Sequence, residues 1–243
     1  MAKTLVITNQ KGGVGKTTTA VNLAASLAAC EQRVLLVDLD PQGNATMGSG
    51  VNKGQLRQSV YHVLLGSAQV VQARQRSQQG GYDVLPANRE LGGAEIELVD
   101  LAERETRLKA ALAAVADDYD FILIDCPPAL NLLTLNGLVA ADRVMIPMQC
   151  EYFALEGLTD LVNTLRKVRA GLNPHIDIEG LLRTMFDPRS TLAQQVAAQL
   201  KQHFGDKVYN VVIPRNVRLA EAPSHGLPAL VYDKSSKGAQ AYL

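Results

Sequence analysis

Short runs of hydrophobic residues alternate along the chain with stretches in which apolar positions recur every three or four residues. The runs are rich in Val, Ile and Leu and predict strands over 3–9, 33–40, 83–87, 121–128, 143–149, 178–186 and 208–214. The stretches between them predict helices over 17–29, 94–116, 131–140, 154–170 and 191–204. Nearly continuous apolar strands that alternate with helices are typical of an α/β fold, a mostly parallel, twisted sheet with helices on both faces.

Residues 48–80 lack this alternation. The segment is rich in Gly, Gln and Ser, and we expect a partly helical surface excursion with mobility around residues 77–81. The chain has 243 residues, of which 47% are hydrophobic, so one large core can be buried. No internal repeat or low-complexity segment divides the sequence, and we expect a single domain over residues 1–243.

Composition excludes several classes of protein. No apolar run reaches the ~18 residues that a membrane-spanning helix needs, and the start MAKTLVITNQ is too short and too β-branched for a secretory signal. The three cysteines are widely spaced and form no C-x-x-C pair, so neither a zinc site nor a disulfide framework is expected. Reduced thiols in a cytoplasmic protein are the simpler interpretation. The four histidines share no metal-ligand spacing.

Between the first predicted strand and helix lies QKGGVGKT, residues 10–17, which is typical of a phosphate-binding loop. Its glycines let successive backbone N–H groups approach phosphate oxygens, and the start of the helix adds a positive end. Lys16 is predicted to reach the β- and γ-phosphates, and the hydroxyl of Thr17 to bind Mg²⁺. The nucleotide-binding residues expected here are Lys11, Gly12, Gly13, Val14, Gly15, Lys16, Thr17 and Thr18.

The loop departs from the usual spacing in two ways. Gln10 stands where the pattern G-x-x-x-x-G-K-[ST] asks for its first glycine, and Lys11 adds a second lysine. From position alone, Lys11 could be an ordinary solvated loop residue.

Acidic residues end two of the predicted strands. Asp125 follows four apolar residues, and ligands bind at this carboxyl edge of an open parallel sheet. We expect Asp125 to hold Mg²⁺ through water. Asp38 and Asp40 end another strand, and Asp40 is predicted to orient the attacking water and to join Thr17 and Asp125 at the metal. Carboxylates at strand ends can also simply cap turns.

Five segments together resemble the ParA/Soj family, the deviant Walker A ATPases that partition chromosomes and plasmids. They are KGGVGKTT (11–18), DLDPQGN (38–44), PANRELGGAEIEL (86–98), LIDCPP (123–128) and IPRNVRLAEAPSHG (213–226). The resemblance covers nearly the whole chain and is weakest over 48–80. It implies a P-loop NTPase fold of the MinD-like kind and a cytoplasmic, nucleoid-associated partition ATPase that uses ATP and Mg²⁺.

The resemblance also gives the second lysine a role. It implies that Lys11 is the signature lysine, which reaches across an ATP-dependent homodimer to the phosphates on the partner subunit. A cation at that point would stabilise charge that develops during phosphoryl transfer, as an arginine finger supplied in trans does. Lys11, Lys16 and Asp40 are therefore the expected catalytic residues. The family further implies non-specific binding of double-stranded DNA and a ParB-type partner that accelerates hydrolysis.

Contacts with the base and with DNA are also implied by resemblance. Pro214 and Asn216 would contact adenine with Met185 nearby, and Arg189 and Arg218 would belong to the DNA surface. Apart from the resemblance, residues 166–218 contain nine Lys/Arg against four Asp/Glu, a net charge of +5 in a chain of zero net charge. Such asymmetry permits binding to the phosphate backbone without base readout.

Three other functions remain open at this point. A MinD-like, membrane-associated regulator of cell division would need a basic amphipathic C-terminal helix. The chain ends KSSKGAQAYL, which is only weakly amphipathic. ParA relatives commonly continue a final helix past this point. An electron-transfer iron protein needs cysteines that bridge a dimer around a cluster, and the surroundings of Cys126 and Cys150 do not match that pattern. A carrier that binds ATP without hydrolysing it would show no Mg²⁺-dependent phosphate release.

Overall fold

The computed structural model describes residues 2–243. Their strands form one eight-stranded sheet in the order β3-β4-β2-β5-β1-β6-β7-β8. Every neighbouring pair is parallel except β3 and β4, which are antiparallel. The strands are β1 Lys3–Ile7, β2 Val34–Asp38, β3 Gln75–Ser77, β4 Tyr82–Leu85, β5 Phe121–Asp125, β6 Arg143–Met148, β7 Asp177–Phe186 and β8 Val208–Pro214. The mostly parallel sheet predicted from the sequence is confirmed.

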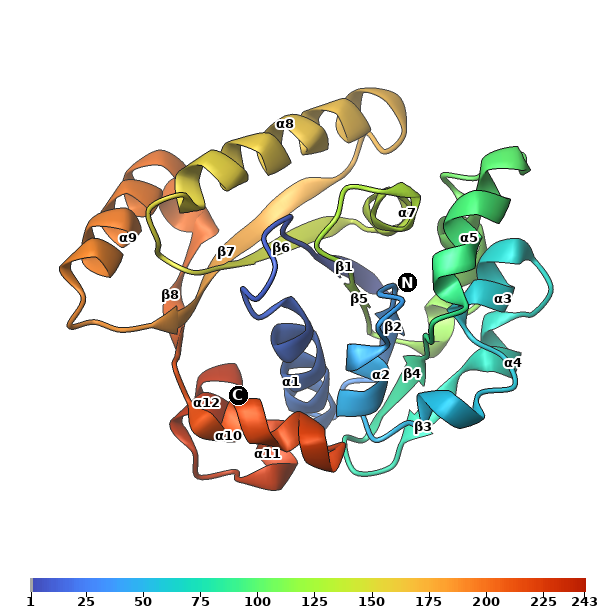
Figure 1. Cartoon of the computed structure of the whole chain (residues 1–243), viewed down its shortest axis with the longest axis horizontal. Helices are drawn as coiled ribbons and strands as arrows, with labels where there is room; N and C mark the ends of the chain where they lie inside the picture. The colour runs from blue at the N-terminus through green and yellow to red at the C-terminus, as the bar shows by residue number, and fades with distance from the viewer. Residues whose placement is uncertain (1) are drawn as a thin grey trace.

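Helices cover both faces of this sheet, and α1 and α12 lie on the opposite side from α7 and α8 (Figure 1). One face carries α1 Lys16–Ala29, α2 Asn44–Gly48, α10 Val217–Glu221, α11 Ala229–Tyr232 and α12 Lys237–Tyr242. The other carries α3 Val60–Leu65, α4 Val70–Ala73, α5 Leu91–Glu97, α6 Arg107–Ala113, α7 Leu132–Ala140, α8 Ala154–Gly171 and α9 Thr191–Phe204.

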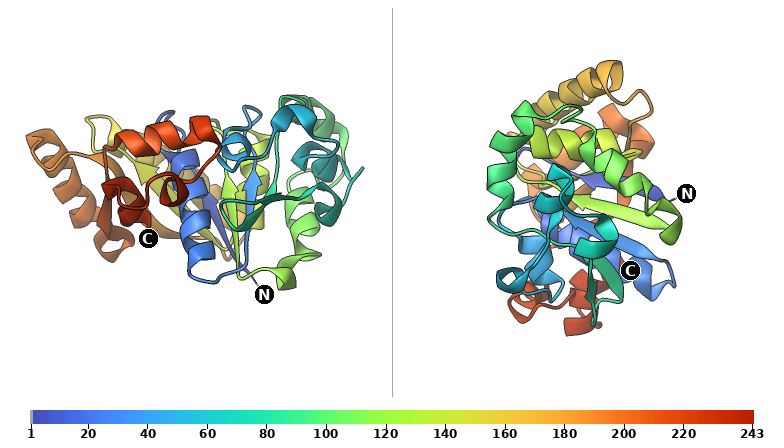
Figure 2. Two further views of the ribbon diagram at one scale, coloured as in Figure 1. Left: turned by 90° about the horizontal axis from the view of Figure 1, so that it is seen from below. Right: turned by 90° about the vertical axis from the view of Figure 1, so that its right-hand side faces the viewer.

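Two hydrophobic cores result from the alternation of side chains along the strands. In β1, Val6 points into the core beneath α3–α9, whereas Leu5 and Ile7 point into the core beneath α1. In β5, Ile122 and Leu123 divide in the same way. Because both faces are buried, the central strands are apolar at nearly every position. The two further views show helices on both sides of the sheet (Figure 2).

The predicted helix over 94–116 is wrong in extent. The chain forms α5, a 3₁₀ turn Leu98–Asp100 and then α6, and Glu103 in the connection has a positive φ of 54°. Asn136 of α7 explains the break, because its Oδ1 accepts from Leu108 N at 3.1 Å and its Nδ2 donates to Arg104 O at 2.8 Å. These tertiary hydrogen bonds favour the interruption over a continuous helix.

The segment 48–80 contains α3 and α4, so the prediction that it is partly helical is confirmed. It also contains the edge strand β3, which the sequence analysis missed. Residues 77–81 form the turn of the β3–β4 hairpin. Ser77 holds this turn, since its carbonyl accepts from Gly81 N at 2.9 Å and its Oγ donates to Ser49 O at 2.8 Å.

The sequence analysis also missed the short helices α10, α11 and α12. In α12, Tyr242 is buried against α1, and its hydroxyl lies 3.0 Å from Thr19 Oγ1. Over residues 2–243, no helix combines the length and apolar character needed to cross a bilayer.

Candidate nucleotide-binding site

The glycine-rich loop joins the central strand β1 to the start of α1, at the carboxyl edge of the sheet (Figure 1). Gly13 and Gly15 have φ values of 73° and 86°, a left-handed backbone that glycine adopts without strain. A Cβ atom added to Gly12 or Gly13 would meet no atom within 4 Å. The loop therefore borders open space, as a cradle of backbone N–H groups for phosphate requires.

Residues outside the motif hold the loop in place. Asn9 Oδ1 accepts from Lys11 N at 3.0 Å, while Asn9 Nδ2 donates to the carbonyl of Pro147 at 2.9 Å. Thr184 Oγ1, near the end of β7, donates to the carbonyl of Val14 at 2.7 Å. Sequence reasoning missed Asn9 and Thr184, because each acts through a contact distant in the chain and neither belongs to a recognisable spacing.

Lys16 is 7% exposed and lies against the loop, where its Nζ donates to the carbonyl of Lys11 at 3.0 Å. Burial lowers the pKa of Lys16, and the nearby carboxylates of Asp125 and Asp40 act in the opposite direction. The amine thus lies close both to the loop and to the two acidic strand ends, where it can bind phosphate oxygens.

Asp125 and Thr17 meet as the sequence predicts. Thr17 Oγ1 donates to Asp125 Oδ2 at 2.7 Å, and Asp125 is fully buried at the end of β5. Its other oxygen, Oδ1, has no hydrogen-bond partner. Burial, and next the neighbouring Asp38, raise the pKa of Asp125 well above its ordinary value, while the Thr17 hydrogen bond opposes the shift.

A buried carboxylate oxygen without a partner is costly, and a hydrated Mg²⁺ ion would satisfy it. Hard oxygen ligands from a carboxylate, a hydroxyl, phosphates and waters are those that Mg²⁺ prefers. Within residues 2–243, no group of three or more His, Cys, Asp or Glu side chains could hold a metal by itself. The donor set therefore fits Mg²⁺ that enters with nucleotide phosphates rather than a resident metal centre.

Asp38 and Asp40 have different surroundings. Asp38 is fully buried, and its Oδ2 accepts from both the N–H and the hydroxyl of Thr46 at 2.8 and 2.7 Å. Burial raises the pKa of Asp38 to about 6. Asp40 is half-buried, and its Oδ1 accepts from Gln42 N at 2.9 Å in a local turn. Asp38 therefore organises the loop after β2, and Asp40 is the carboxylate with access to a ligand.

A cavity of about 410 Å³ opens beside the phosphate loop. It lies between the start of α1, α2 and the 3₁₀ turn Ala222–His225, and its volume is in the range of small-molecule sites. The residues that line it include Thr17, Thr18, Asn22, Met47, Lys53 and Pro223. Only Thr17 and Thr18 were expected at a ligand.

The three residues expected at the base lie at neighbouring strand ends. Met185 has a positive φ of 48°, rare for a side chain of its size, and its sulfur accepts from Gln149 Nε2 at 3.1 Å. Pro214 ends β8 and pairs in register with Phe186. Asn216 Oδ1 accepts from two backbone N–H groups and caps α10. None of the three lines the 410 Å³ cavity, and their contact with adenine stays a prediction.

Both arginines expected at DNA are exposed and are also paired with acids. Arg189 binds Asp187 through two hydrogen bonds of 3.0 Å, which raise the pKa of the guanidinium. Arg218 forms ion pairs with Glu221 at 2.8 Å and Asp233 at 3.3 Å. Either side chain could exchange these surface partners for phosphates at little cost.

Other basic residues of the 166–218 segment serve the fold. Arg169 and Lys207 both bind Asp177, at 2.7 and 3.0 Å. The guanidinium of Arg183 lies over the ring of Phe186, 5.4 Å from its centroid. Part of the positive charge counted in the sequence is therefore neutralised within the subunit.

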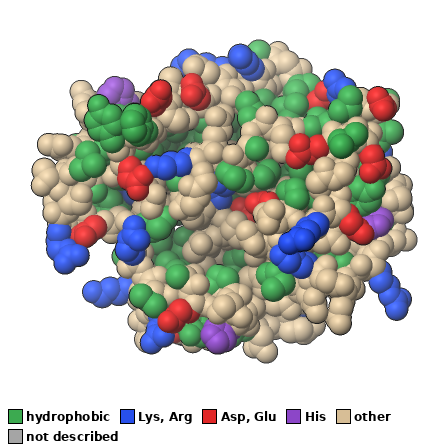
Figure 3. All heavy atoms as spheres, in the orientation of Figure 1, with side chains coloured by type: hydrophobic (Ala, Val, Ile, Leu, Met, Phe, Trp, Pro, Cys, Tyr) green, Lys and Arg blue, Asp and Glu red, His purple; other side chains and the backbone are tan. Residues whose placement is uncertain are grey.

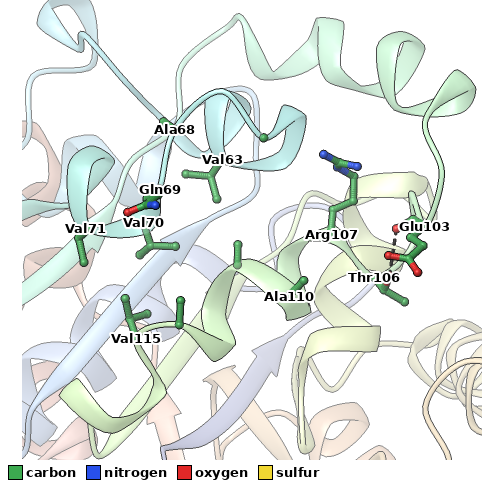
Figure 4. A pocket seen from close by; sticks show the side chains of 13 residues that line it. Val63, Ala68, Gln69, Val70, Val71, Glu103, Thr106, Arg107, Ala110 and Val115 are labelled. Atoms are coloured by element: carbon green, nitrogen blue, oxygen red, sulfur yellow. Dashed lines mark hydrogen bonds between the residues drawn. The ribbon is translucent and has the colours of Figure 1, made fainter.

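A second cavity, of about 400 Å³, lies away from the phosphate loop between α3, α4 and α6 (Figure 4). Val63, Val70, Ala110 and Val115 line it, and the guanidinium of Arg107 near one end donates to the carbonyl of Leu64. This arginine caps α3 and offers little to a ligand.

Comparisons with known proteins identify relatives of the chain. Residues 2–178 match the family model described as AAA domain. Over its whole length, the chain is 57% identical to the sporulation initiation inhibitor protein Soj of Bacillus subtilis and covers 96% of it. It is 54% identical to the chromosome partitioning protein ParA of Caulobacter vibrioides, with 99% of this chain and 91% of that protein covered.

Solved structures share this fold, and one of them illustrates the likeness. Cobyrinic acid a,c-diamide synthase from Mycobacterium smegmatis, with bound ATP analogue and magnesium, aligns with a TM-score of 0.89 at 40% identity, covering 100% of this chain and 91% of that one. The fold and the glycine loop thus define the class, an α/β P-loop nucleotide-binding protein. The chain belongs to the ParA/Soj family of partition ATPases, within the AAA domain family. The fold class and the family predicted from the sequence are confirmed.

Proposed function

We propose that this protein is an ATP-dependent partition ATPase that works as a dimerisation switch. ATP binding drives a sandwich homodimer, the dimer binds double-stranded DNA without sequence specificity, and Mg²⁺-dependent hydrolysis returns it to free subunits. The observation that carries the proposal is the Thr17–Asp125 hydrogen bond of 2.7 Å beside an open glycine loop, with one buried carboxylate oxygen left without a partner.

Each residue of the site has a distinct part in the proposed reaction. The backbone N–H groups of residues 12–15 and the amine of Lys16 bind and orient the phosphates. Thr17 and Asp125 would hold Mg²⁺, which when bound neutralises charge on the phosphate oxygens. Asp40 orients the water that attacks the γ-phosphoryl group.

Lys11 supports the dimeric part of the proposal. Its side chain is 42% exposed, and its Nζ pairs with Glu151 rather than with a group of its own phosphate loop. The amine is therefore accessible to a second copy. In the proposed dimer each Lys11 neutralises phosphates bound to the other copy, so that ATP becomes part of the interface.

DNA and a ParB-type protein are the proposed partners. The name chromosome partitioning protein, which the ParA relative carries, and the exposure of Arg189 and Arg218 support DNA. The ParB-type partner follows from the family resemblance. In the proposed cycle, which runs in the cytoplasm on nucleoid DNA, the ParB-type partner accelerates hydrolysis and its DNA cargo moves as the switch resets.

The test is the rate of phosphate release with Mg²⁺ and ATP, alone, with DNA, and with DNA plus the candidate partner. We expect a slow basal rate that DNA and partner together increase, and loss of that rate in Asp40→Ala while ATP binding is retained. Binding of ATP without any phosphate release under these conditions would reduce the protein to a carrier.

A further inference from the structure

Tyr152 and Phe153 form an exposed aromatic pair between β6 and α8. They are 76% and 67% exposed, and their rings meet edge to face with centroids 5.0 Å apart. Every other Tyr and Phe of the chain is buried or half-buried. Hydrophobic side chains gather near the start of α8 on the face seen in Figure 3. Adjacent large apolar groups left in water are typical of a surface that another molecule covers.

The pair belongs to a segment that contacts the nucleotide site. Glu151, the preceding residue, binds Lys11 of the phosphate loop with an Nζ–Oε2 distance of 2.5 Å. Gln149 donates to the sulfur of Met185 at the end of β7. Residues 149–153 therefore contact both the end of β7 and the phosphate loop, and the two aromatic residues directly follow the residue that binds the lysine proposed to reach a second subunit.

We infer that residues 149–153 form part of the face that a second copy of this chain covers in the ATP-bound dimer, with Tyr152 and Phe153 as its apolar contact. The inference rests on the proposed ATP-dependent dimer. A copy that receives Lys11 at its phosphates must approach the surface around Lys11, and the aromatic pair adjoins that surface. The rings then lose their contact with water when the dimer forms.

Charge favours a second copy over a nucleic acid at this surface. Lys11 and Glu151 lie side by side and together carry no net charge. In a two-fold interface each contact made by one copy is repeated by the other, and the uncharged aromatic rings bring no repulsion between like charges to it. A polyanion would be attracted by Lys11 and repelled equally by Glu151.

The inference is tested with the double variant Tyr152→Ser/Phe153→Ser. Dimerisation with a slowly hydrolysed ATP analogue is followed by sedimentation, and nucleotide binding to the monomer reports folding. We expect the dimer Kd to rise about tenfold or more, as for loss of a central aromatic contact. The matched control is Ile96→Ser/Val99→Ser, which removes two side chains that are 77% and 52% exposed near α5, and it should leave the Kd unchanged.

A fluorescent probe gives a second measurement without weakening the contact. The chain contains no tryptophan, so Phe153→Trp introduces a single reporter at the proposed contact. Its emission should shift to shorter wavelength when ATP drives dimerisation. The same substitution combined with Lys11→Ala should show no shift.

The outcomes separate this inference from the proposed function. If the wild-type protein forms no dimer with ATP, the proposed function itself fails. If the wild-type protein dimerises, but the double variant has the same Kd and the reporter stays exposed to water, only the inference is overturned. Normal dimerisation with loss of stimulation by the ParB-type partner would assign the aromatic pair to that protein and also overturn the inference.

Discussion

The Nζ atom of Lys11 lies 2.5 Å from Oε2 of Glu151, an ion pair within one subunit between residues 140 positions apart. Both side chains are exposed, by 42% and 50%, and such pairs contribute about 0–1 kcal/mol. The pair is therefore strong enough to bias where Lys11 points and weak enough to break when phosphates compete for the amine.

Glu151→Gln should make ATP-dependent dimerisation easier. The variant removes the charge that holds Lys11 on its own subunit, and we expect the dimer Kd to fall about two- to thirtyfold, because each of the two subunits releases one exposed ion pair of about 0.2–1 kcal/mol. Sedimentation across a series of protein concentrations measures the change. Glu156→Gln, an exposed acid in the first turn of α8, is the control; a weaker dimer in Glu151→Gln would mean that the carboxylate stabilises the dimer instead.

Lys11→Ala should separate nucleotide binding from dimerisation. Lys16 and the loop N–H groups remain, so the monomer should still bind ATP, whereas the cation proposed to reach the second copy is lost. We expect no dimer by sedimentation at saturating ATP. Lys16→Ala is the companion variant and should lose ATP binding itself. A normal Lys11→Ala dimer would remove Lys11 from the interface.

Asp125→Asn should raise the Mg²⁺ requirement of the site. The amide oxygen can still accept from Thr17, but the negative charge that would attract the hydrated ion is gone. We expect the Mg²⁺ concentration for half-maximal phosphate release to rise about tenfold or more, since one full charge is lost in a buried site. Nucleotide binding measured in EDTA should change little, and an unchanged Mg²⁺ dependence would argue against Asp125 at the metal.

Local patterns predicted the parts of the site that lie within one motif. The glycine loop, Thr17 and Asp125 are each encoded by a short spacing at the end of a strand, and parallel pairing brings these ends to one edge of the sheet. Glu151 could not be predicted in the same way, because nothing in the residues around Lys11 indicates a partner beyond β6.

The errors in the fold also come from distant contacts. Periodicity over 94–116 predicts one helix, but Asn136 binds the backbone at Arg104 and Leu108 and favours a break. Helices α10, α11 and α12 have four to six residues each, too few for a helical period to be recognised. Packing stabilises them instead, on α1 for α11, on α1 and β8 for α12, and on α11 and α12 for α10.

Asp177→Asn should destabilise the protein in a pH-dependent way. Although burial acts to raise the pKa of Asp177, the hydrogen bonds from Lys207 and Arg169 lower it to about 2. Because this pKa lies below that of the unfolded chain, the carboxylate stabilises the fold above about pH 4, and the contribution is lost as pH falls toward 2. Allowing for partial exposure, we expect a loss of about 1 kcal/mol at pH 7.

Urea denaturation of both proteins at pH 7 and pH 3 measures this difference, which should shrink by about half at the lower pH. A difference that stays constant with pH would show that the side chain acts through its shape rather than through its charge.

Charge reversal at the two exposed arginines should weaken DNA binding without preventing dimerisation. Arg189→Glu and Arg218→Glu each replace a cation proposed to contact phosphate, and the slope of log affinity against log salt should fall by about 1 for each lost contact. Retention of DNA by the ATP-bound protein over a salt series measures both the affinity and the salt slope.

Arg218 also binds Glu221 and Asp233, so Arg218→Lys, which keeps the charge, controls for loss of that local structure. Wild-type affinity and slope in both reversals would mean that the DNA surface lies elsewhere, because neither guanidinium would then displace a counterion from the duplex.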